Sequence, residues 1–329
     1  KQVEKELEAR WGKRIRSEVG RHTRSNVSGI PGLRFQWRQY SDQYLYLYLV
    51  GNYQDKNGQS RAFAYSVDKH GFDEVLRRGL GDRGSHDVRR HDVEFAFGNP
   101  GSIVYPRSSN KPMQAVAMVR AGLRLPPELL ALVCASHGGT PAHTEGVLRI
   151  LAGAGLGPDA LGNTPSLPAD EAAAHDVLRA GGSAAALTMN CSGKHAGMLA
   201  TCLLHGWEQA GYLAIDHPLQ LAVTDVIDEL CAEPHTHIGV DGCGAPAHAM
   251  SLLGLARAFR SIATGQAGAA GDEVYAAMTR YPQMVGGEGR DVTAFMRHVP
   301  GLLAKDGAEG VFAMALPDGR AVAVKIADG

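Results

Sequence analysis

The fold of this chain is decided by the stretch Asn190-Cys191-Ser192-Gly193-Lys194-His195-Ala196-Gly197-Met198. It brings a thiol, a hydroxyl, an amine and an imidazole into consecutive positions, from Cys191 to His195. The apolar Leu187-Thr188-Met189 precedes it, and a helix-like apolar run over 196–204 follows. We therefore predict a strand-to-helix junction, where the backbone N–H groups at the helix start favour negative charge. A tight turn with a buried cysteine and a surface lysine is the alternative for this stretch taken alone.

Charge and aromatic content divide the sequence into two regions. Residues 1–80 carry 15 Lys and Arg against 9 Asp and Glu, and they hold 11 of the 21 aromatic residues. The rest of the chain carries 18 basic against 25 acidic residues. The net charge of −1 over 329 residues gives no sign that the whole chain binds nucleic acid or membrane. We expect two domains, residues 1–80 and 81–329.

The cysteine count bears on the cellular compartment. None of the five cysteines stands in a C-x-x-C pair, and an odd count favours reduced thiols and a cytoplasmic protein. No apolar run approaches the roughly 18–20 residues of a membrane span, and the charged start of the chain has no signal-peptide core.

Alternating residues between positions 33 and 67, with a turn at Asp55-Lys56-Asn57-Gly58, predict a three-stranded antiparallel sheet. A short helix is expected to begin at Gly71-Phe72-Asp73-Glu74. With Ser28-Gly29-Ile30-Pro31-Gly32 and the segment 66–74, this region resembles the DNA-binding domain of plant ethylene-response factors, in the version found in phage and bacterial endonucleases and integrases. The resemblance implies weak DNA binding through three residues of the sheet, Arg34, Trp37 and Arg38. A small structural sheet with a solvated basic face is the alternative.

Ser108 and Lys111 form a Ser-x-x-Lys pair before an apolar helix expected over 115–121. The spacing places both on one helix face, where the lysine amine can take the proton of the serine hydroxyl. Ser-x-x-Lys is also the nucleophile signature of β-lactamases and penicillin-binding proteins. A penicillin-recognising acyl enzyme is therefore one alternative, disfavoured by Cys191 and Cys243 and by the lack of a signal peptide.

Five ordered motifs carry a more specific resemblance. They are Pro-Arg-Ser-x-x-Lys-Pro-x-Gln at 106–114, Ala-Ser-His-x-Gly at 135–139, the opening stretch at 190–198, Val-Asp-Gly-Cys-Gly-Ala-Pro at 240–246 and Ala-Lys-x-Gly-Ala-Glu-Gly at 304–310. Over about residues 92–329 the chain resembles the Rhizobium-type (class 3) L-asparaginases. The resemblance implies an α/β (α+β) fold of the serine β-lactamase-like and glutaminase-like kind, an antiparallel sheet flanked by helices, and a homodimer.

The same resemblance implies two Ser–Lys tandems, Ser108 with Lys111 and Ser136 with Lys305. One of the two serines would attack the side-chain amide carbon of L-asparagine, ammonia would leave, and water would then release aspartate. We expect burial and nearby positive charge to lower the pKa values of these lysines, because a base must be partly neutral.

The resemblance also implies residues that bind substrate and metal. The substrate-binding residues would be Arg107, His137 and Asp241. A Zn²⁺ ion would be held by Cys191, Lys194 and Cys243, since two thiolates suit zinc and few protein ligands leave room for water or substrate. Buried free thiols are the alternative.

Two loops depart from the family pattern, and the asparaginase-like domain is expected to be shortened at both ends. Residues 136–140 lack the hydroxyl and the carboxylate that the family carries after the histidine, and Glu288 places a carboxylate where a small hydroxyl is usual. A DNA-binding module fused to a degenerate, inactive asparaginase-like domain is therefore a further alternative.

Overall fold

The computed structural model describes residues 24–26, 34–41, 44–54, 60–68, 93, 96 and 98–326. The chain divides into two compact units, Lys1–Gly98 and Asn99–Gly329, which we describe separately. Among the described residues no helix is both long and apolar enough to cross a membrane.

The strands of the first unit form one antiparallel sheet. Its strand order is β1-β2-β3-β4, with bounds Arg24–Asn26, Arg34–Ser41, Tyr44–Gln54 and Ser60–Asp68. The sheet thus has four strands where the sequence predicts three. The additional strand, β1, is the short polar segment Arg-Ser-Asn, which has no alternation that could reveal it.

The expected DNA-contact residues all lie on β2. In the register with β3, Arg34 is opposite Val50, Trp37 is opposite Leu47 and Arg38 is opposite Tyr46. The helix expected to begin at Gly71 lies outside the described residues.

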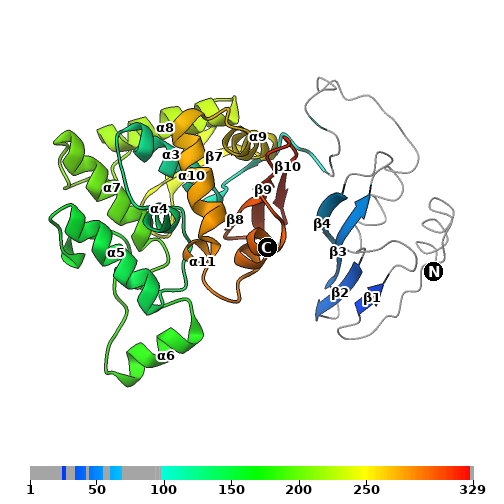
Figure 1. Ribbon diagram of the computed structural model, residues 1–329, viewed down its shortest axis with the longest axis horizontal. Helices are drawn as coiled ribbons and strands as arrows, with labels where there is room; N and C mark the ends of the chain where they lie inside the picture. Colours follow the sequence, from blue (N-terminus) through cyan, green and yellow to red (C-terminus); the bar gives the residue numbers. More distant parts are fainter. Residues whose placement is uncertain are drawn as a thin grey trace. The chain divides into compact units, whose positions relative to one another are not determined.

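The second unit combines helices with two small antiparallel sheets (Figure 1). One sheet has the order β5-β7-β6 and the other β10-β9-β8. This confirms the mixed α and β class that the sequence predicts. The strands are β5 (Ile103–Val104), β6 (His237–Val240), β7 (Pro246–Ser251), β8 (Leu303–Gly307), β9 (Val311–Ala315) and β10 (Ala321–Lys325).

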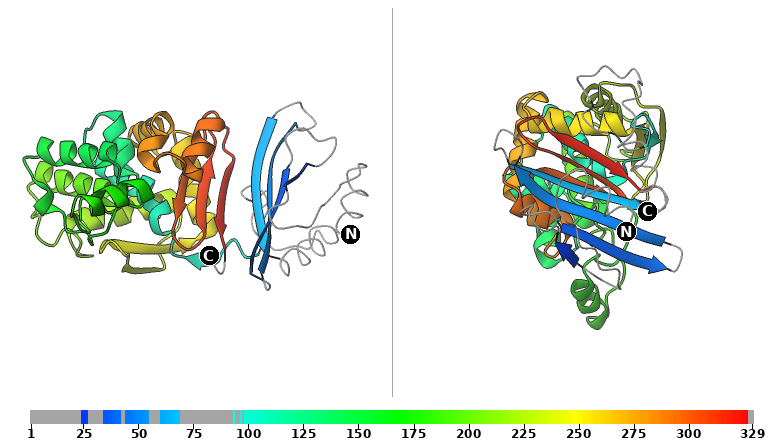
Figure 2. Two further views of the ribbon diagram at one scale, coloured as in Figure 1. Left: turned by 90° about the horizontal axis from the view of Figure 1, so that it is seen from below. Right: turned by 90° about the vertical axis from the view of Figure 1, so that its right-hand side faces the viewer.

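Helices make up most of the regular secondary structure of this unit, and α9 packs on β9 and β10. Figure 2 shows the β8–β10 strands side by side at one edge of the helical body. The helices are η1 (Arg107–Asn110), α3 (Lys111–Arg120), α4 (Pro127–Val133), α5 (Pro141–Gly153), η2 (Pro158–Ala160), α6 (Glu171–Arg179), α7 (Ser192–His205), α8 (Pro218–Cys231), α9 (Leu252–Ala263), α10 (Gly268–Arg280), α11 (Pro282–Val285) and α12 (Asp291–His298).

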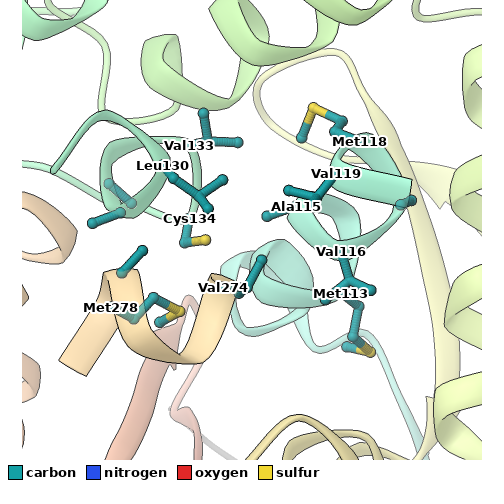
Figure 3. Packing of buried hydrophobic residues seen from close by; sticks show 14 of the residues in the cluster. Met113, Ala115, Val116, Met118, Val119, Leu130, Val133, Cys134, Val274 and Met278 are labelled. Carbon is teal, nitrogen blue, oxygen red and sulfur yellow. The ribbon is translucent and has the colours of Figure 1, made fainter. Parts of the chain in front are cut away.

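Helix α3 forms the centre of the core. Every residue from Lys111 to Val119 is buried, because most of them are apolar and neighbouring elements enclose the helix. Figure 3 shows its side chains with those of the α4 segment and α10. The labelled residues are Met113, Ala115, Val116, Met118, Val119, Leu130, Val133, Cys134, Val274 and Met278.

Two glycines allow α7 to approach α4 closely. A Cβ atom at Gly193 would lie 2.3 Å from the backbone oxygen of Leu132, and one at Gly197 would lie 2.9 Å from the Val133 side chain. The helix predicted to follow the opening stretch is present as α7. The predicted strand before it is wrong, because residues 187–189 form turns in which Thr188 Oγ1 donates to Ser166 O at 2.6 Å.

Candidate active site

Lys111 and Ser136 make a direct contact at the start of α3. Lys111 Nζ donates to Ser136 Oγ at 3.2 Å and also to the backbone oxygen of Ala135. Lys111 is 1% exposed and Ser136 is 7% exposed, so this contact is shielded from water. It joins the lysine of one expected tandem to the serine of the other.

Ser108, the other expected nucleophile, lies in η1 and is half-buried. Its backbone oxygen accepts the N–H of Lys111 at the end of η1. Within the described part of the chain, no hydrogen bond joins the Ser108 hydroxyl to Lys111 Nζ. The lysine of this turn therefore contacts the Ser136 loop rather than the serine three residues before it.

Lys305 lies in β8 and is fully buried. Burial and the positive charge of Lys111 lower its pKa to about 8, although Asp306 acts in the opposite direction. Its Nζ donates to the carboxylate and the backbone oxygen of Asp306. No hydrogen bond joins it to Ser136 among the described residues. The structure thus supplies a lysine that can lose its proton near neutral pH.

Asp306 was not singled out from the sequence. Burial alone would raise its pKa, but the charges of Lys305 and Arg290 lower it to about 2. Arg290 Nη2 donates to Asp306 Oδ2 at 3.1 Å. The sequence feature that could have identified Asp306 is its position directly after Lys305 in the fifth motif.

The expected metal-binding residues lie together in the interior. Lys194 Nζ donates to Cys243 Sγ at 3.1 Å, and Cys191 Sγ donates to Asn190 Oδ1 at 3.0 Å. Cys191 and Cys243 share a hydrogen bond that lowers the pKa of Cys191 and raises the pKa of Cys243. Burial lowers the pKa of the Lys194 amine, but the two thiols outweigh it and the pKa is raised.

This donor set fits zinc in its chemistry, since it offers two sulfur atoms and one nitrogen in a buried position. The set reaches three donors only if Lys194 takes part, and its amine must lose a proton to bind a metal. No group of three or more His, Cys, Asp or Glu side chains in the described part of the chain is arranged to hold a metal ion.

Arg107 and Asp241 form the expected substrate-binding pair. Arg107 Nε donates to Asp241 Oδ1 at 2.7 Å, and Asp241 also accepts the N–H of Gly242 at 2.8 Å. The carboxylate raises the pKa of Arg107, and despite burial the hydrogen bond from Arg107 lowers the pKa of Asp241. A second carboxylate, Glu309, pairs with Arg107 Nη1. Sequence reasoning did not single it out, although it lies within the fifth motif.

His137 is fully buried, and both of its ring nitrogens are bonded within the protein. Gly139 N–H donates to Nδ1 at 3.1 Å, so the ring proton lies on Nε2 and is directed at Ser192 Oγ, 3.0 Å away. Burial and the nearby positive groups lower the pKa of His137 well below its ordinary value. The imidazole is therefore neutral and holds the Ser136 loop against the start of α7.

A second histidine, His143, also contacts this loop. The rings of His137 and His143 stack with centroids 5.1 Å apart. His143 Nε2 donates to Gln283 O at 3.0 Å, and Thr140 Oγ1 donates to His143 Nδ1 at 2.7 Å. The hydroxyl proton of Thr140 is thus used within the loop.

The model of a family described as L-asparaginase II matches residues 87–329. The search of curated proteins found no match. The matched segment contains every residue of the site described above and excludes the β1–β4 sheet.

Proposed function

This chain belongs to the L-asparaginase II family, and from this premise we propose that it hydrolyses L-asparagine to L-aspartate and ammonia through a serine acyl-enzyme. Family membership indicates an amidohydrolase. The observation that carries the finer proposal is the buried hydrogen bond of 3.2 Å between Lys111 Nζ and Ser136 Oγ.

In the proposed first step, Ser136 Oγ attacks the side-chain amide carbon as its proton moves to a neutral Lys111 amine. The C–N bond breaks, the leaving nitrogen takes the proton from Lys111, and ammonia departs. Water then attacks the ester carbon and gives a proton to the site, Ser136 Oγ regains a proton, and L-aspartate is released. Lys305, whose pKa is about 8, is proposed to take up or release a proton during these two steps.

Substrate recognition is assigned to the Arg107–Asp241 pair. A guanidinium binds a carboxylate through two parallel N–H groups, and Asp241 keeps the Arg107 side chain in place through its Nε. His137 is proposed to position the Ser136 loop, because neither of its ring nitrogens is free for substrate.

Zinc is proposed to be held by Cys191, Lys194 and Cys243. When bound there it would polarise a carbonyl or a water molecule next to the site. Zinc content of the purified protein tests this directly. We expect it to fall in Cys191→Ser and to persist in Cys202→Ser, a buried cysteine outside the proposed donor set. Equal zinc content in both variants would contradict the assignment.

The experiment that tests the proposed function is ammonia release from L-asparagine by four proteins, the unaltered chain and the variants Ser136→Ala, Ser108→Ala and Ser261→Ala. Ser261 lies in α9 and serves as the control. We expect Ser136→Ala to abolish release and Ser261→Ala to leave it unchanged. Loss with Ser108→Ala alone would move the nucleophile to η1, and no release by the unaltered chain would overturn the proposal. Acylation by a labelled penicillin would instead favour the alternative enzyme class.

Three further properties are proposed from the resemblances. The fold would be of the serine β-lactamase-like kind, and the protein would be a homodimer, which light scattering can test. The separate β1–β4 sheet, with Arg34, Trp37 and Arg38, would bind duplex DNA weakly. Binding that weakens steeply as salt rises would support this, whereas no binding at low salt would contradict it.

A further inference from the structure

The guanidinium of Arg107 lies between two carboxylates that come from distant parts of the chain. Its Nε donates to Asp241 and its Nη1 pairs with Glu309. The side chains are 15% exposed at Asp241, 26% at Arg107 and 54% at Glu309. The three groups therefore run from the interior towards solvent, and Glu309 is the outermost.

In the pair of Arg107 and Glu309, both residues have a positive backbone φ angle, which is uncommon for residues other than glycine. Arg107 has φ 52° and Glu309 has φ 61°, and Ala232 is the only other non-glycine residue with positive φ in the described part of the chain. Glu309 occupies the turn between β8 and β9, next to Gly310. Asparagine or glycine would adopt this conformation more easily. The glutamate is thus held in a turn that it does not favour, and its carboxylate is directed at Arg107.

The chemistry of an α-amino acid matches this arrangement. Its ammonium and carboxylate groups are attached to one carbon, so a neighbouring anion and cation in a site complement both groups at once. Asp241 accepts both Arg107 Nε and the N–H of Gly242 at its Oδ1, and it is only 15% exposed. Glu309 is the more exposed carboxylate of the two, at 54%. The three groups together carry one negative charge, which favours a further cation.

Resting on the proposed asparaginase function, we propose that Glu309 determines specificity by binding the α-ammonium group of the substrate while Arg107 binds the α-carboxylate. The substrate carboxylate takes over Arg107 Nη1, and the released Glu309 carboxylate turns to the ammonium group beside it. A hydrogen bond from Lys325 Nζ to the backbone oxygen of Glu309 stabilises the turn.

The test compares L-asparagine with succinamic acid, which is the same molecule without the α-amino group. In Glu309→Gln we expect kcat/KM for L-asparagine to fall about tenfold to hundredfold, mainly through KM, because a charge-assisted contact to the ammonium is lost. The value for succinamic acid should change less than about twofold. Glu309→Asp should recover part of the loss, since it keeps the charge on a shorter side chain.

The matched control is Glu229→Gln. Glu229 is 57% exposed and also pairs with an arginine, Arg120, on α8 rather than at the site, so neither substrate should be affected. Equal losses for both compounds in Glu309→Gln would show a structural role for Glu309 and overturn the inference. A lower KM for L-asparagine would overturn it as well, because Glu309 would then only block Arg107. If the unaltered chain releases ammonia from neither compound, the proposed function fails and the inference fails with it.

Discussion

The site consists of two clusters that treat charge in opposite ways. The inner cluster, Lys111, Ser136 and Lys305, is at most 7% exposed. The outer cluster, Arg107, Asp241 and Glu309, is 15% to 54% exposed and consists of ion pairs. Burial penalises charge, so the inner cluster suits groups whose charge changes during the reaction. The outer cluster suits groups that must stay charged to recognise a zwitterion. Under the proposed function, proton transfer and substrate recognition would therefore fall to separate clusters.

The largest effect is expected when the proposed base, Lys111, is removed. Lys111→Met should lower kcat by about 1000-fold, because a positioned general base contributes roughly 100-fold to 10,000-fold. Steady-state ammonia release measures this, and a thermal unfolding curve checks that the variant folds. Lys111→Arg sharpens the comparison, because arginine keeps the positive charge but cannot act as a neutral base. An arginine variant within tenfold of the unaltered chain would show that the charge, and not the base, is what the inner cluster needs.

The second prediction concerns the packing that forms the inner cluster. Gly193→Ala should destabilise the fold by about 2–3 kcal/mol, because the new Cβ would lie 2.3 Å from the backbone oxygen of Leu132. Gly153→Ala is the control, since a Cβ there meets nothing within 4 Å, and it should be neutral or stabilise by up to about 1 kcal/mol. Urea unfolding of both variants provides the measurement. Equal stability of the two would mean that α7 and α4 can separate without cost.

The sequence singled out most residues of the two clusters, but not Glu309 and not which of these side chains contact one another. The five motifs identified Lys111, Ser136, Arg107 and Asp241, which the structure brings together in pairs. The sequence did not predict that Lys111 would contact Ser136 rather than Ser108. That pairing depends on how the end of α4 packs against α3, and a spacing of three residues describes only a single helix face.

The outer cluster and the first sheet show the same limit. Glu309 lies in a predicted motif, but the observations behind its proposed role, the positive φ of its turn and its contact with Arg107, come from the structure alone. Strand β1 is too short and too polar to show periodicity. Local patterns predict elements, whereas contacts between distant segments follow from packing that no single segment encodes.

The third prediction uses pH to test whether the inner cluster titrates. If Lys305 must be neutral, kcat/KM should rise with pH through about 8, where its lowered pKa lies. Asp306→Asn removes a negative charge that raises this pKa, so the rise should shift to lower pH by about one unit. Asp176→Asn, which removes a carboxylate that is 75% exposed, should not shift it. An unchanged profile in Asp306→Asn would assign the titration to another group.

The same shift has a consequence for stability. Between pH 8 and 10.5 the folded protein has released the Lys305 proton while the unfolded chain still holds it, so the unfolded state binds more protons. The free energy of unfolding should therefore gain a contribution from Lys305 as pH rises through this window. Lys305→Met should remove that contribution, and urea unfolding at several pH values between these limits measures it.

The smallest expected effect lies in the outer cluster. Glu309→Asn replaces a residue that disfavours positive φ by one that tolerates it, which should stabilise the turn. It also removes a half-exposed ion pair, which contributes about 0–1 kcal/mol. The two changes should nearly cancel, so the free energy of unfolding should stay within about 0.5 kcal/mol while the preference for L-asparagine over succinamic acid falls. A loss of more than about 2 kcal/mol would show that Glu309 serves the fold, because a side chain kept for recognition can be replaced at little cost to stability.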